Sequence, residues 1–373
     1  MKLFEYQAKE IFAAAGIPVP SSVLVEDTAG LDAALETAGL PCVLKAQVLT
    51  GGRGKAGLIR FAASREAAAS ALEALLKREG VPQVLVEQAV DIEKELYLSV
   101  SMEPVTGQAL LMGCAEGGVE IEQLAAERPE SILRQGVNLG DGLLPFQISD
   151  FVWRLGLRGD AFKQAGQVLR KLYEVFTRHD AELVEINPLF LTKDGGVVAG
   201  DGKLLIDDNS LFRQKANPIQ RRQFASDAEY DAALEGIPYL TFGGDIGLMC
   251  AGAGLTNTVF DLIHYEGGSV SGYVEFGGPN YHKAEKAMKL CLSTRPKVIL
   301  MVTFGTIARA DVMAQGVADA IASLSPPCPI VTCLRGTGEE EARRILESIG
   351  LTCLSDTEEA VRAAIALSKG EGV

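Results

Sequence analysis

The chain alternates short apolar runs with amphipathic helical stretches, and it does so in two separate parts, 23–110 and 239–373. This alternation is typical of α/β architecture, because each buried strand needs a helix to cover its face. In the first part the expected strands are rich in apolar and β-branched residues. They are 23–25, 42–48, 57–61, 84–87 and 95–100, with helices over 28–39 and 64–79. A further helix is expected before this part, over 6–15.

The second part predicts an open, mostly parallel sheet whose strands alternate with helices. No segment of about 20–50 residues recurs, which excludes a repeat array. The expected strands are 272–276, 298–302, 330–333 and 352–354, and the expected helices are 283–292, 311–324 and 339–348.

The region between these parts predicts a mixture of elements. Residues 108–123 are expected to form two strands, and 140–175 a loop followed by two helices. The stretch 213–237 is polar and has no regular period, which is typical of a linker. We therefore expect a multidomain α/β and α+β protein divided into 1–225 (with a small inserted subdomain at about 21–100), a linker over 226–238, and 239–373.

The composition narrows the class of protein. With 47% hydrophobic and 23% charged residues, the chain has a soluble, globular composition, and its N-terminus has no signal-peptide core. No run approaches the ~20 apolar residues of a membrane span. Seven cysteines without a Cys-x-x-Cys pair favour reduced thiols in the cytoplasm. A net charge of −14 argues against nucleic acid as a partner.

The stretch 184–204 carries the most specific chemistry. It predicts two strands joined by a tight turn at 194–196, with Glu185 and Asn187 on one face. Folding the hairpin brings Asp201 nearly opposite Asn187, so three oxygen-bearing side chains converge. Such a set suits Mg²⁺ that keeps waters and shares substrate phosphates, although an acidic, solvated face is an equal alternative.

A glycine-rich loop follows the strand that carries Lys45. It contains Gly51, Gly52, Gly54 and Gly57, interleaved with Arg53 and Lys55. Glycines let backbone N–H groups turn toward an anion, and the cations neutralise it, so we favour phosphate contact over a flexible basic turn. A later segment, from Glu87 to Glu95, is either a nucleoside-binding edge or a charged loop between strands.

Two loops of the second part, 243–254 and 302–312, follow strands and lead into helices. The carboxyl ends of parallel strands are where ligands bind in open α/β sheets, and helix N-termini favour anions there. Plain strand–helix turns are the equal alternative. The chain has only three histidines, at 179, 264 and 282, and none lies in a recognisable nucleophile motif. A covalent nucleophile, if the reaction uses one, is expected in another chain.

Several motifs together resemble the β subunit of succinyl-CoA synthetase along essentially the whole chain. They are Leu-Phe-Glu-Tyr-Gln-Ala-Lys at 3–9, Gly-Gly-Arg-Gly-Lys-Ala-Gly at 51–57, Asp-Ile-Glu-Lys-Glu-Leu-Tyr at 91–97, Glu-Gly-Gly-Val-Glu-Ile-Glu at 116–122, Val-Glu-Ile-Asn-Pro-Leu at 184–189, Asp-Gly-Lys-Leu at 201–204 and Leu-Phe-Arg-Gln at 211–214. The resemblance implies an ATP-grasp fold followed by a flavodoxin-like, doubly wound CoA-ligase domain.

The resemblance also implies roles for individual residues. Nucleotide phosphates would be held by Lys45, Gly52, Arg53 and Gly54, and base and ribose by Glu87, Val90 and Glu95. Mg²⁺ would bind Asn187 and Asp201, and Glu185 would meet a phosphohistidine from a partner α subunit, which also binds CoA. The implied reaction makes acyl-CoA, ADP and phosphate from ATP, a short carboxylic acid and CoA.

The departures from the family pattern fall in the loops expected to face the acid. The family has Asn where this chain has Ala251, and a Gly-Gly-Ile-Val turn where this chain has Gly305, Thr306, Ile307 and Ala308. Its three-glycine run is replaced by 276–282, which ends in His282. Losing a buried polar contact costs about tenfold to a hundredfold in discrimination. We therefore expect an acid other than succinate: a hydroxy-acid, a sulfonate or a longer carboxylate.

Alternatives remain open from the sequence. Succinate itself could be retained, with the loop changes neutral. An ATP-grasp enzyme joining a carboxylate to an amine would not need the second domain, and a non-catalytic nucleotide-binding subunit would not need both Asn187 and Asp201. The choice between ATP and GTP, and between one αβ pair and two, is not readable from these residues.

Overall fold

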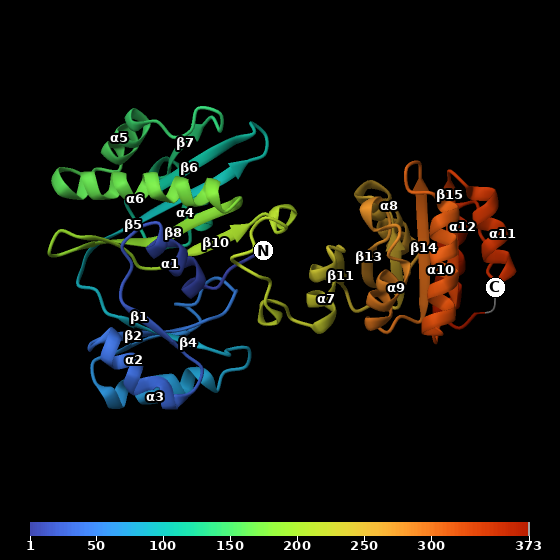
Figure 1. Ribbon diagram of the computed structural model, residues 1–373, viewed down its shortest axis with the longest axis horizontal. Helices are drawn as coiled ribbons and strands as arrows, with labels where there is room; N and C mark the ends of the chain where they lie inside the picture. The colour runs from blue at the N-terminus through green and yellow to red at the C-terminus, as the bar shows by residue number, and fades with distance from the viewer. Residues whose placement is uncertain (372–373) are drawn as a thin grey trace. The chain divides into compact units, whose positions relative to one another are not determined.

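The computed structural model describes residues 1–371, and the chain divides into two compact units, Met1–Pro218 and Ile219–Val373 (Figure 1). This boundary lies before the expected one at residue 225. Each unit has its own hydrophobic core, so each is described by itself.

The first unit begins with a small α/β layer, drawn in blue in Figure 1. Its antiparallel sheet has the order β1-β4-β2-β3, and two helices cover one face. The strands are β1 (Ser22–Val25), β2 (Cys42–Ala46), β3 (Ile59–Ala62) and β4 (Val84–Gln88), and the helices are α2 (Leu31–Ala38) and α3 (Arg65–Leu76). The core between sheet and helices includes Leu44, Val86 and Leu72. The expected strand 95–100 is not part of this layer, because it belongs to β5 (Ile92–Glu103) of the larger sheet.

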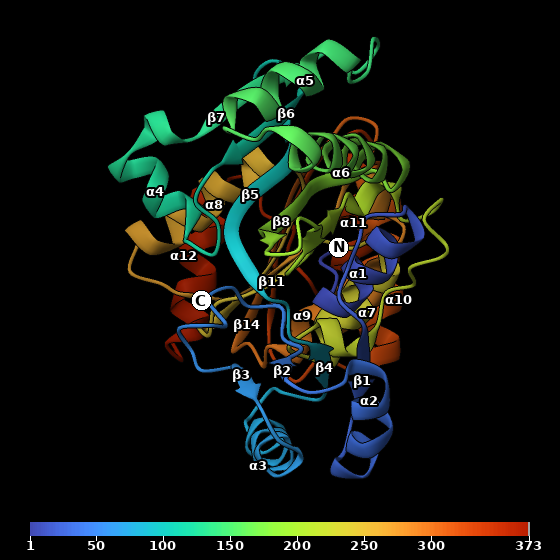
Figure 2. The same cartoon turned by 90° about the vertical axis from the view of Figure 1, so that its left-hand side faces the viewer.

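The rest of the first unit is a larger antiparallel sheet of order β10-β8-β5-β6-β7, with β9 paired to β8. Its strands are β5 (Ile92–Glu103), β6 (Gln108–Cys114), β7 (Leu133–Val137), β8 (Ala181–Thr192), β9 (Val197–Ala199) and β10 (Lys203–Ile206). The long strand β5 curves strongly, and its register with β8 shifts twice (Figure 2). The packed helices are α1 (Glu5–Ala14), α4 (Ile121–Glu127), α5 (Pro145–Arg154) and α6 (Gly159–Arg178).

Two expected strands are wrong. Residues 352–354 form no strand, only an isolated bridge between Cys353 and Thr332. Residues after Cys114 form a loop and then α4 instead of a second strand. Gly117 explains the change, because its N–H bonds to the Glu95 carbonyl and a Cβ there would lie 2.4 Å from the Leu96 carbonyl oxygen. The loop is therefore held against β5, and the alternating pattern that follows it is a short helix.

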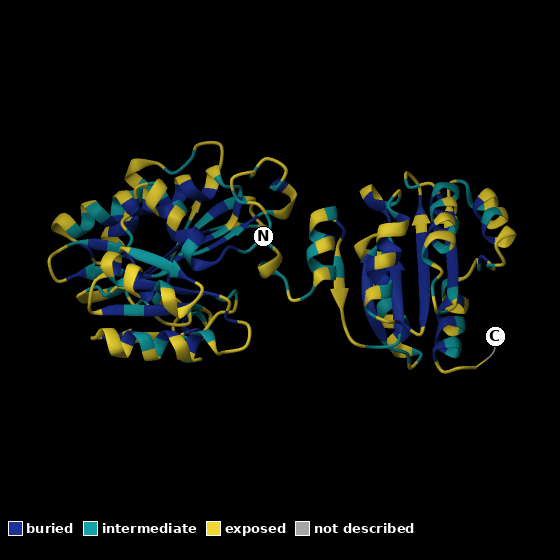
Figure 3. Cartoon of the chain, turned by 60° about the horizontal axis from the view of Figure 1, so that its bottom comes forward, coloured by how far each residue is buried: buried dark blue, intermediate teal, exposed yellow. Residues whose placement is uncertain are grey.

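The second unit is a sheet of order β11-β13-β12-β14-β15, parallel except for β11. Its strands are β11 (Tyr239–Thr241), β12 (Ile246–Cys250), β13 (Val270–Glu275), β14 (Val298–Gly305) and β15 (Ile330–Gly336). Helices cover both faces, and the strands between them are buried (Figure 3). Burial on both faces explains why these strands are continuous apolar runs.

The helices of the second unit are α7 (Asp227–Glu235), α8 (Ala253–Tyr265), α9 (Ala284–Ser293), α10 (Ala310–Leu324), α11 (Glu339–Ser348) and α12 (Thr357–Ser368). One core cluster joins α9, α10 and α11 to the sheet, and the other joins α8 and α12 to its opposite face. The expected linker contains α7, and both Ala232 and Ile237 are buried in the first of these clusters. Within the described residues, no helix is both long and apolar enough to span a membrane.

Candidate active site

The hairpin that was expected to carry the metal ligands has the predicted geometry. Leu189 pairs with Ala199 in β8–β9, and Lys203 pairs with Glu185 in β8–β10. The two pairings belong to one continuous register, which places Asp201 level with Asn187. The structure therefore confirms the prediction that these side chains lie close together.

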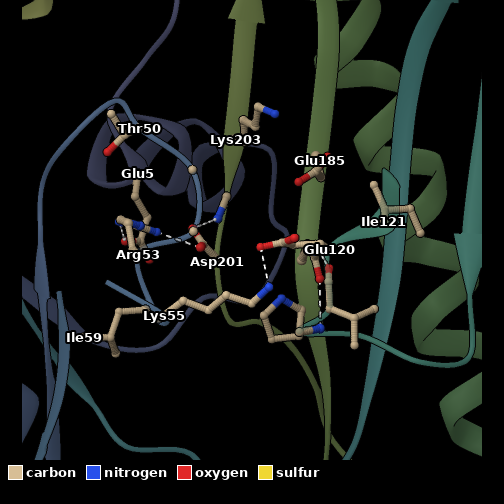
Figure 4. Close-up of a pocket in the computed structure, with 18 of the residues that line it drawn as sticks. Glu5, Thr50, Arg53, Lys55, Ile59, Glu120, Ile121, Glu185, Asp201 and Lys203 are labelled. Atoms are coloured by element: carbon tan, nitrogen blue, oxygen red, sulfur yellow. Dashed lines mark hydrogen bonds and ion pairs between the residues drawn. The ribbon is translucent and has the colours of Figure 1, made fainter. Parts of the chain in front are cut away.

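These residues line a cavity of about 680 Å³ in the first unit (Figure 4). Its wall brings together distant segments: α1, the glycine loop after β2, the loop before α4, and the β8–β10 hairpin. Among the sequence-predicted residues, it contains Gly52, Arg53, Gly54, Glu95, Glu185, Asn187 and Asp201.

The glycine loop joins the antiparallel strands β2 and β3, so it is a turn and not the start of a helix. Gly52 has φ +72°, a backbone conformation that favours glycine. Arg53 points inward and is buried, whereas Lys55 is exposed and pairs with Glu120 across the cavity mouth (Nζ to Oε1, 2.7 Å; Figure 4). Of the two loop cations, Arg53 is the one built into the interior.

A buried ion network lies beneath the loop. Glu5 contacts Lys45 at 2.9 Å, Lys9 at 3.0 Å and Arg53 at 2.6 Å. Glu87 pairs with Lys9 and, at 2.8 Å, with Lys45. The network holds equal numbers of carboxylates and cations, and its members are Glu5, Glu87, Asp201, Lys9, Lys45 and Arg53. Because the opposite charges are equal in number, their mutual attraction offsets the free-energy cost of removing them from water.

The electrostatics of the network keep Glu5 and Lys45 ionised. Burial would raise the pKa of Glu5, but Lys45, Lys9 and Arg53 together lower it well below its ordinary value. Burial would likewise lower the pKa of Lys45, but Glu5, Glu87 and Asp201 raise it. The cations beside the cavity are therefore fixed positive charges at every physiological pH.

Three of the expected nucleotide residues do not line the cavity. The Glu87 side chain is 2% exposed and is committed to Lys9 and Lys45. Lys45 reaches the cavity wall through its contact with Glu5, and it also donates to the Gly200 carbonyl at 2.6 Å. Val90 is half-buried in the connection between β4 and β5. Their roles toward a nucleotide stay predictions.

Glu185 lies on the opposite wall, where Tyr97 and Ser99 hold it. The Tyr97 hydroxyl lies 3.3 Å from Glu185 Oε2 and 2.9 Å from Ser99 Oγ. Burial raises the pKa of Glu185, Lys203 opposes that shift, and Glu122 adds to it. A carboxyl of this kind accepts a proton more readily than an exposed one does, which suits contact with a cationic or protonated group.

The candidate metal residues supply hard oxygen atoms, as Mg²⁺ requires. Asn187 Oδ1 accepts from the Gly118 N–H at 2.9 Å, and its Nδ2 donates to the Val119 carbonyl at 3.0 Å, so the amide oxygen is fixed in orientation. Asp201 Oδ2 accepts from Arg53 at 2.6 Å. The residues fit a cation that completes its shell with waters and phosphate oxygens.

The expected acid-binding residues lie in the second unit. Ala251 follows β12 and Thr306 follows β14, and the two strands are adjacent and parallel, so both residues lie at one edge of the sheet. That edge is the point where the strand order reverses, the usual ligand position in this class of sheet. Ile307 is 89% exposed, Ala308 is half-buried, and His282 is exposed in the loop after β13.

The loops at this edge are tightly packed. A Cβ at Gly277 would lie 2.3 Å from the Ala251 Cβ, and one at Gly305 would lie 1.9 Å from the Ala308 carbonyl oxygen. The Gly252 N–H donates to Glu275 at 3.0 Å, which ties the first loop to β13. Small residues at these positions therefore set the shape of the edge.

Glu5 and Lys203 are among the cavity-lining residues that sequence reasoning missed. Glu5 and Lys9 are one helical turn apart, on the same face as the buried Ala8 and Phe12. Charges on an apolar helix face were the available signal for a buried ion pair. Lys203 could have been found from the hairpin register, which places it opposite Glu185.

Comparisons with known proteins agree with this architecture. Residues 2–191 match the ATP-grasp domain family, and residues 249–367 match the CoA-ligase family. An ATP-grasp domain implies ATP binding. The ATP citrate lyase from Methanothrix soehngenii, solved with citrate and coenzyme A, aligns with a TM-score of 0.75 over 97% of this chain and 98% of that chain. At 19% identity, that likeness shows the fold alone.

Curated relatives match over the full length. The ADP-forming sulfoacetate-CoA ligase subunit SauC of Bilophila wadsworthia is 56% identical over 99% of this chain and 100% of its own. The ADP-forming sulfoacetate-CoA ligase subunit SqwK from an Acholeplasma species is 53% identical over 100% of this chain and 92% of its own. The β subunit of succinate–CoA ligase from Ignicoccus hospitalis is 38% identical over 99% and 100%. The chain therefore belongs to the succinyl-CoA synthetase β-like family, the β subunits of ADP-forming acid–CoA ligases.

Proposed function

We propose that this chain is the β subunit of a ligase that joins sulfoacetate to coenzyme A. The observation that carries the proposal is the difference in identity: 56% and 53% to two sulfoacetate-CoA ligase subunits, against 38% to a succinate–CoA ligase subunit. The overall reaction converts ATP, the acid and coenzyme A into acyl-CoA, ADP and phosphate.

The cavity of the first unit would bind the nucleotide. Phosphoryl transfer needs little covalent help from a protein, and charge neutralisation with positioning supplies most of the catalysis. Arg53 is a fixed cation at the cavity wall, and Lys45 stands behind it in the same network. Asn187 and Asp201 would hold Mg²⁺, which when bound neutralises charge on the phosphate oxygens.

A partner subunit would carry the covalent nucleophile. The three histidines of this chain, at 179, 264 and 282, are not among the residues that line the cavity. A phosphorylated histidine on an α subunit, which also binds CoA, would meet Glu185. The buried carboxylate, held by Tyr97, would then fix the orientation of the imidazole.

The acid would bind at the edge where β12 and β14 end. Sulfoacetate carries a sulfonate with three acceptor oxygens where succinate carries a carboxymethyl group, so its chain is also shorter by one atom. The N-termini of α8 and α10 begin beside Ala251 and Thr306, and backbone N–H groups at helix N-termini favour an anion. Ala251 removes the family's amide, and Thr306 supplies a hydroxyl donor in the neighbouring loop.

Steady-state kinetics of the assembled enzyme test the proposal. The chain is co-expressed with its α partner, and thioester formation is measured with ATP, Mg²⁺ and CoA for sulfoacetate, succinate and a hydroxy-acid. We expect kcat/KM for sulfoacetate to exceed that for succinate by about tenfold or more. Succinate as the better acid would refute the sulfoacetate assignment and leave the family reaction intact. Nucleotide binding without turnover of any acid would favour a regulatory subunit.

A further inference from the structure

Glu5 occupies the centre of the buried ion network, and no function has been assigned to it. Its carboxylate is 4% exposed and lies at the first residue of α1. One oxygen contacts Lys45 at 2.9 Å and Lys9 at 3.0 Å, and the other contacts Arg53 at 2.6 Å and the Gln47 amide at 3.4 Å. Both oxygens are therefore fully committed, and the residue still lines the cavity.

We propose that Glu5 is a positioning residue of the nucleotide site, which holds Arg53 at the cavity wall where the phosphates bind and Lys45 behind it. The proposal rests on the proposed nucleotide-binding function of this cavity. Glu5 itself does not contact the nucleotide phosphates in this arrangement, because a carboxylate beside phosphate oxygens would repel them.

The charge of Glu5 is what brings the two cations together. Lys45 and Arg53 both lie within 3 Å of one carboxylate, and two buried cations this close repel each other strongly without it. The Lys45 ammonium has a second carboxylate partner, Glu87. Arg53 has Asp201, which is itself a candidate metal ligand. Glu5 is thus the one member of the network that contacts both Lys45 and Arg53.

The two terminal nitrogens of the Arg53 guanidinium make this positioning specific. Its Nη1 donates to Glu5 and its Nη2 to Asp201, each at 2.6 Å. A guanidinium holds two acceptors in a rigid fork, so it can exchange one acceptor and keep the other. When a phosphate takes Nη2, Glu5 retains Nη1, and Asp201 becomes available to a cation. Glu5 therefore keeps its contact with Arg53 Nη1 while a phosphate replaces Asp201 at Nη2.

Lys9 offers a matched control within the same network. It contacts Glu5, Glu87 and the Gly200 carbonyl, and it is as buried as Glu5. It does not belong to the cavity wall. Removing Lys9 therefore disturbs the buried charges to a similar extent but leaves Glu5 in contact with both Lys45 and Arg53.

The test measures nucleotide affinity and turnover in the assembled αβ enzyme. A fluorescent ADP analogue reports binding directly, and KM for ATP and kcat are measured with saturating acid and CoA. We expect Glu5→Gln to weaken analogue binding and raise KM for ATP by about tenfold or more, since charge-assisted contacts position both cations. Lys9→Met should change both by less than about threefold, even if it lowers the melting temperature equally.

A second variant keeps the proposal testable if Glu5→Gln fails to fold. Glu5→Asp retains the charge but withdraws it by one methylene, so we expect a smaller rise in KM than for Gln and a normal far-ultraviolet spectrum. Equal effects of Glu5→Gln and Lys9→Met on nucleotide KM would reduce Glu5 to a stabilising residue and overturn the proposal. A wild-type enzyme that binds no nucleotide analogue would instead overturn the proposed function of the cavity.

Discussion

The proposed nucleotide cavity and the proposed acid-facing edge of this protein are built on opposite principles. The cavity is framed by buried, mutually neutralising charges that converge from α1, β2, β4 and the β8–β10 hairpin. The edge of the second unit is framed by small residues and exposed loops, with Ala251 packed against Gly277. The first arrangement suits one invariant polyphosphate, whereas the second can be reshaped by single substitutions to suit different acids.

The largest expected effect comes from replacing Arg53, the buried cation at the cavity wall. Arg53→Gln removes the fork that would hold a phosphate and leaves Glu5 with one partner fewer. We expect kcat/KM for ATP to fall by about a hundredfold or more, because charge neutralisation is the main catalytic contribution of such a site. Initial rates at varied ATP measure this. Arg53→Lys, which keeps the charge and loses the fork, should recover only part of the activity.

A second prediction addresses the acid-facing edge. The double variant Ala251→Asn with Thr306→Gly restores the family residues at both positions. We expect the ratio of kcat/KM for sulfoacetate over succinate to fall by about tenfold, while KM for ATP stays within about twofold. Paired acid titrations measure the ratio. An unchanged ratio, with the variant folded, would show that these residues do not select the acid.

A third prediction uses the contact between Arg53 and Asp201. Both Asp201 oxygens are engaged within the protein, one by Arg53 at 2.6 Å and one by the Gly202 N–H at 2.7 Å. A divalent cation alone must displace the guanidinium, so we expect Mn²⁺ to bind at least about tenfold more weakly without nucleotide than with it. Electron paramagnetic resonance of free Mn²⁺ measures both affinities.

The same measurement has an internal control. Arg53→Gln removes the competing cation, so it should strengthen Mn²⁺ binding in the absence of nucleotide. Equal Mn²⁺ affinity in the wild type with and without nucleotide would contradict the exchange of partners at Asp201.

The smallest expected effect concerns stability and pH. Burial raises the pKa of Glu185, Lys203 opposes the shift, and Glu122 adds to it. Between the ordinary and the raised pKa the folded state binds a proton that the unfolded state does not, so stability falls as pH rises through that interval. Glu185→Gln removes this penalty and should raise the melting temperature by about 1–3 °C at about pH 8, with no gain near about pH 4.

Differential scanning calorimetry at both pH values measures this difference. Glu182→Gln, at an exposed position of the same strand, should show no such dependence. An equal shift for the two variants would mean that burial does not set the effect. The gain in stability at Glu185 should be accompanied by a loss of thioester formation, since the carboxylate is proposed to meet the phosphohistidine.

The elements that follow from local patterns were predictable from the sequence. The central hairpin was confirmed because its turn residues and strand alternation fix the register, and Asn187 and Asp201 follow from that register. The parallel sheet of the second unit was likewise visible in its buried apolar strands. The strand expected before α4 failed because the close approach of Gly117 to β5 is a tertiary constraint that alternation does not show.

The buried ion network could not be derived in the same way. Its members stand at positions 5, 9, 45, 53, 87 and 201, and only the folded chain shows that they share one small volume. Glu87 illustrates the difference, because the family resemblance implied a role in binding base and ribose, whereas its side chain pairs with Lys9 and Lys45. The family resemblance located loop positions such as Ala251 and Thr306. The strand order of the sheet shows that the two loops lie next to each other.

The central claim, that the acid-facing edge has been reshaped for sulfoacetate, is tested most directly by competition. The αβ enzyme receives equal concentrations of sulfoacetate and succinate in one reaction with limiting CoA, and mass spectrometry measures the ratio of the two thioesters. The account predicts sulfoacetyl-CoA in excess by about tenfold or more. An excess of succinyl-CoA would contradict it and would mean that Ala251 and Thr306 are neutral changes in a succinate-specific enzyme.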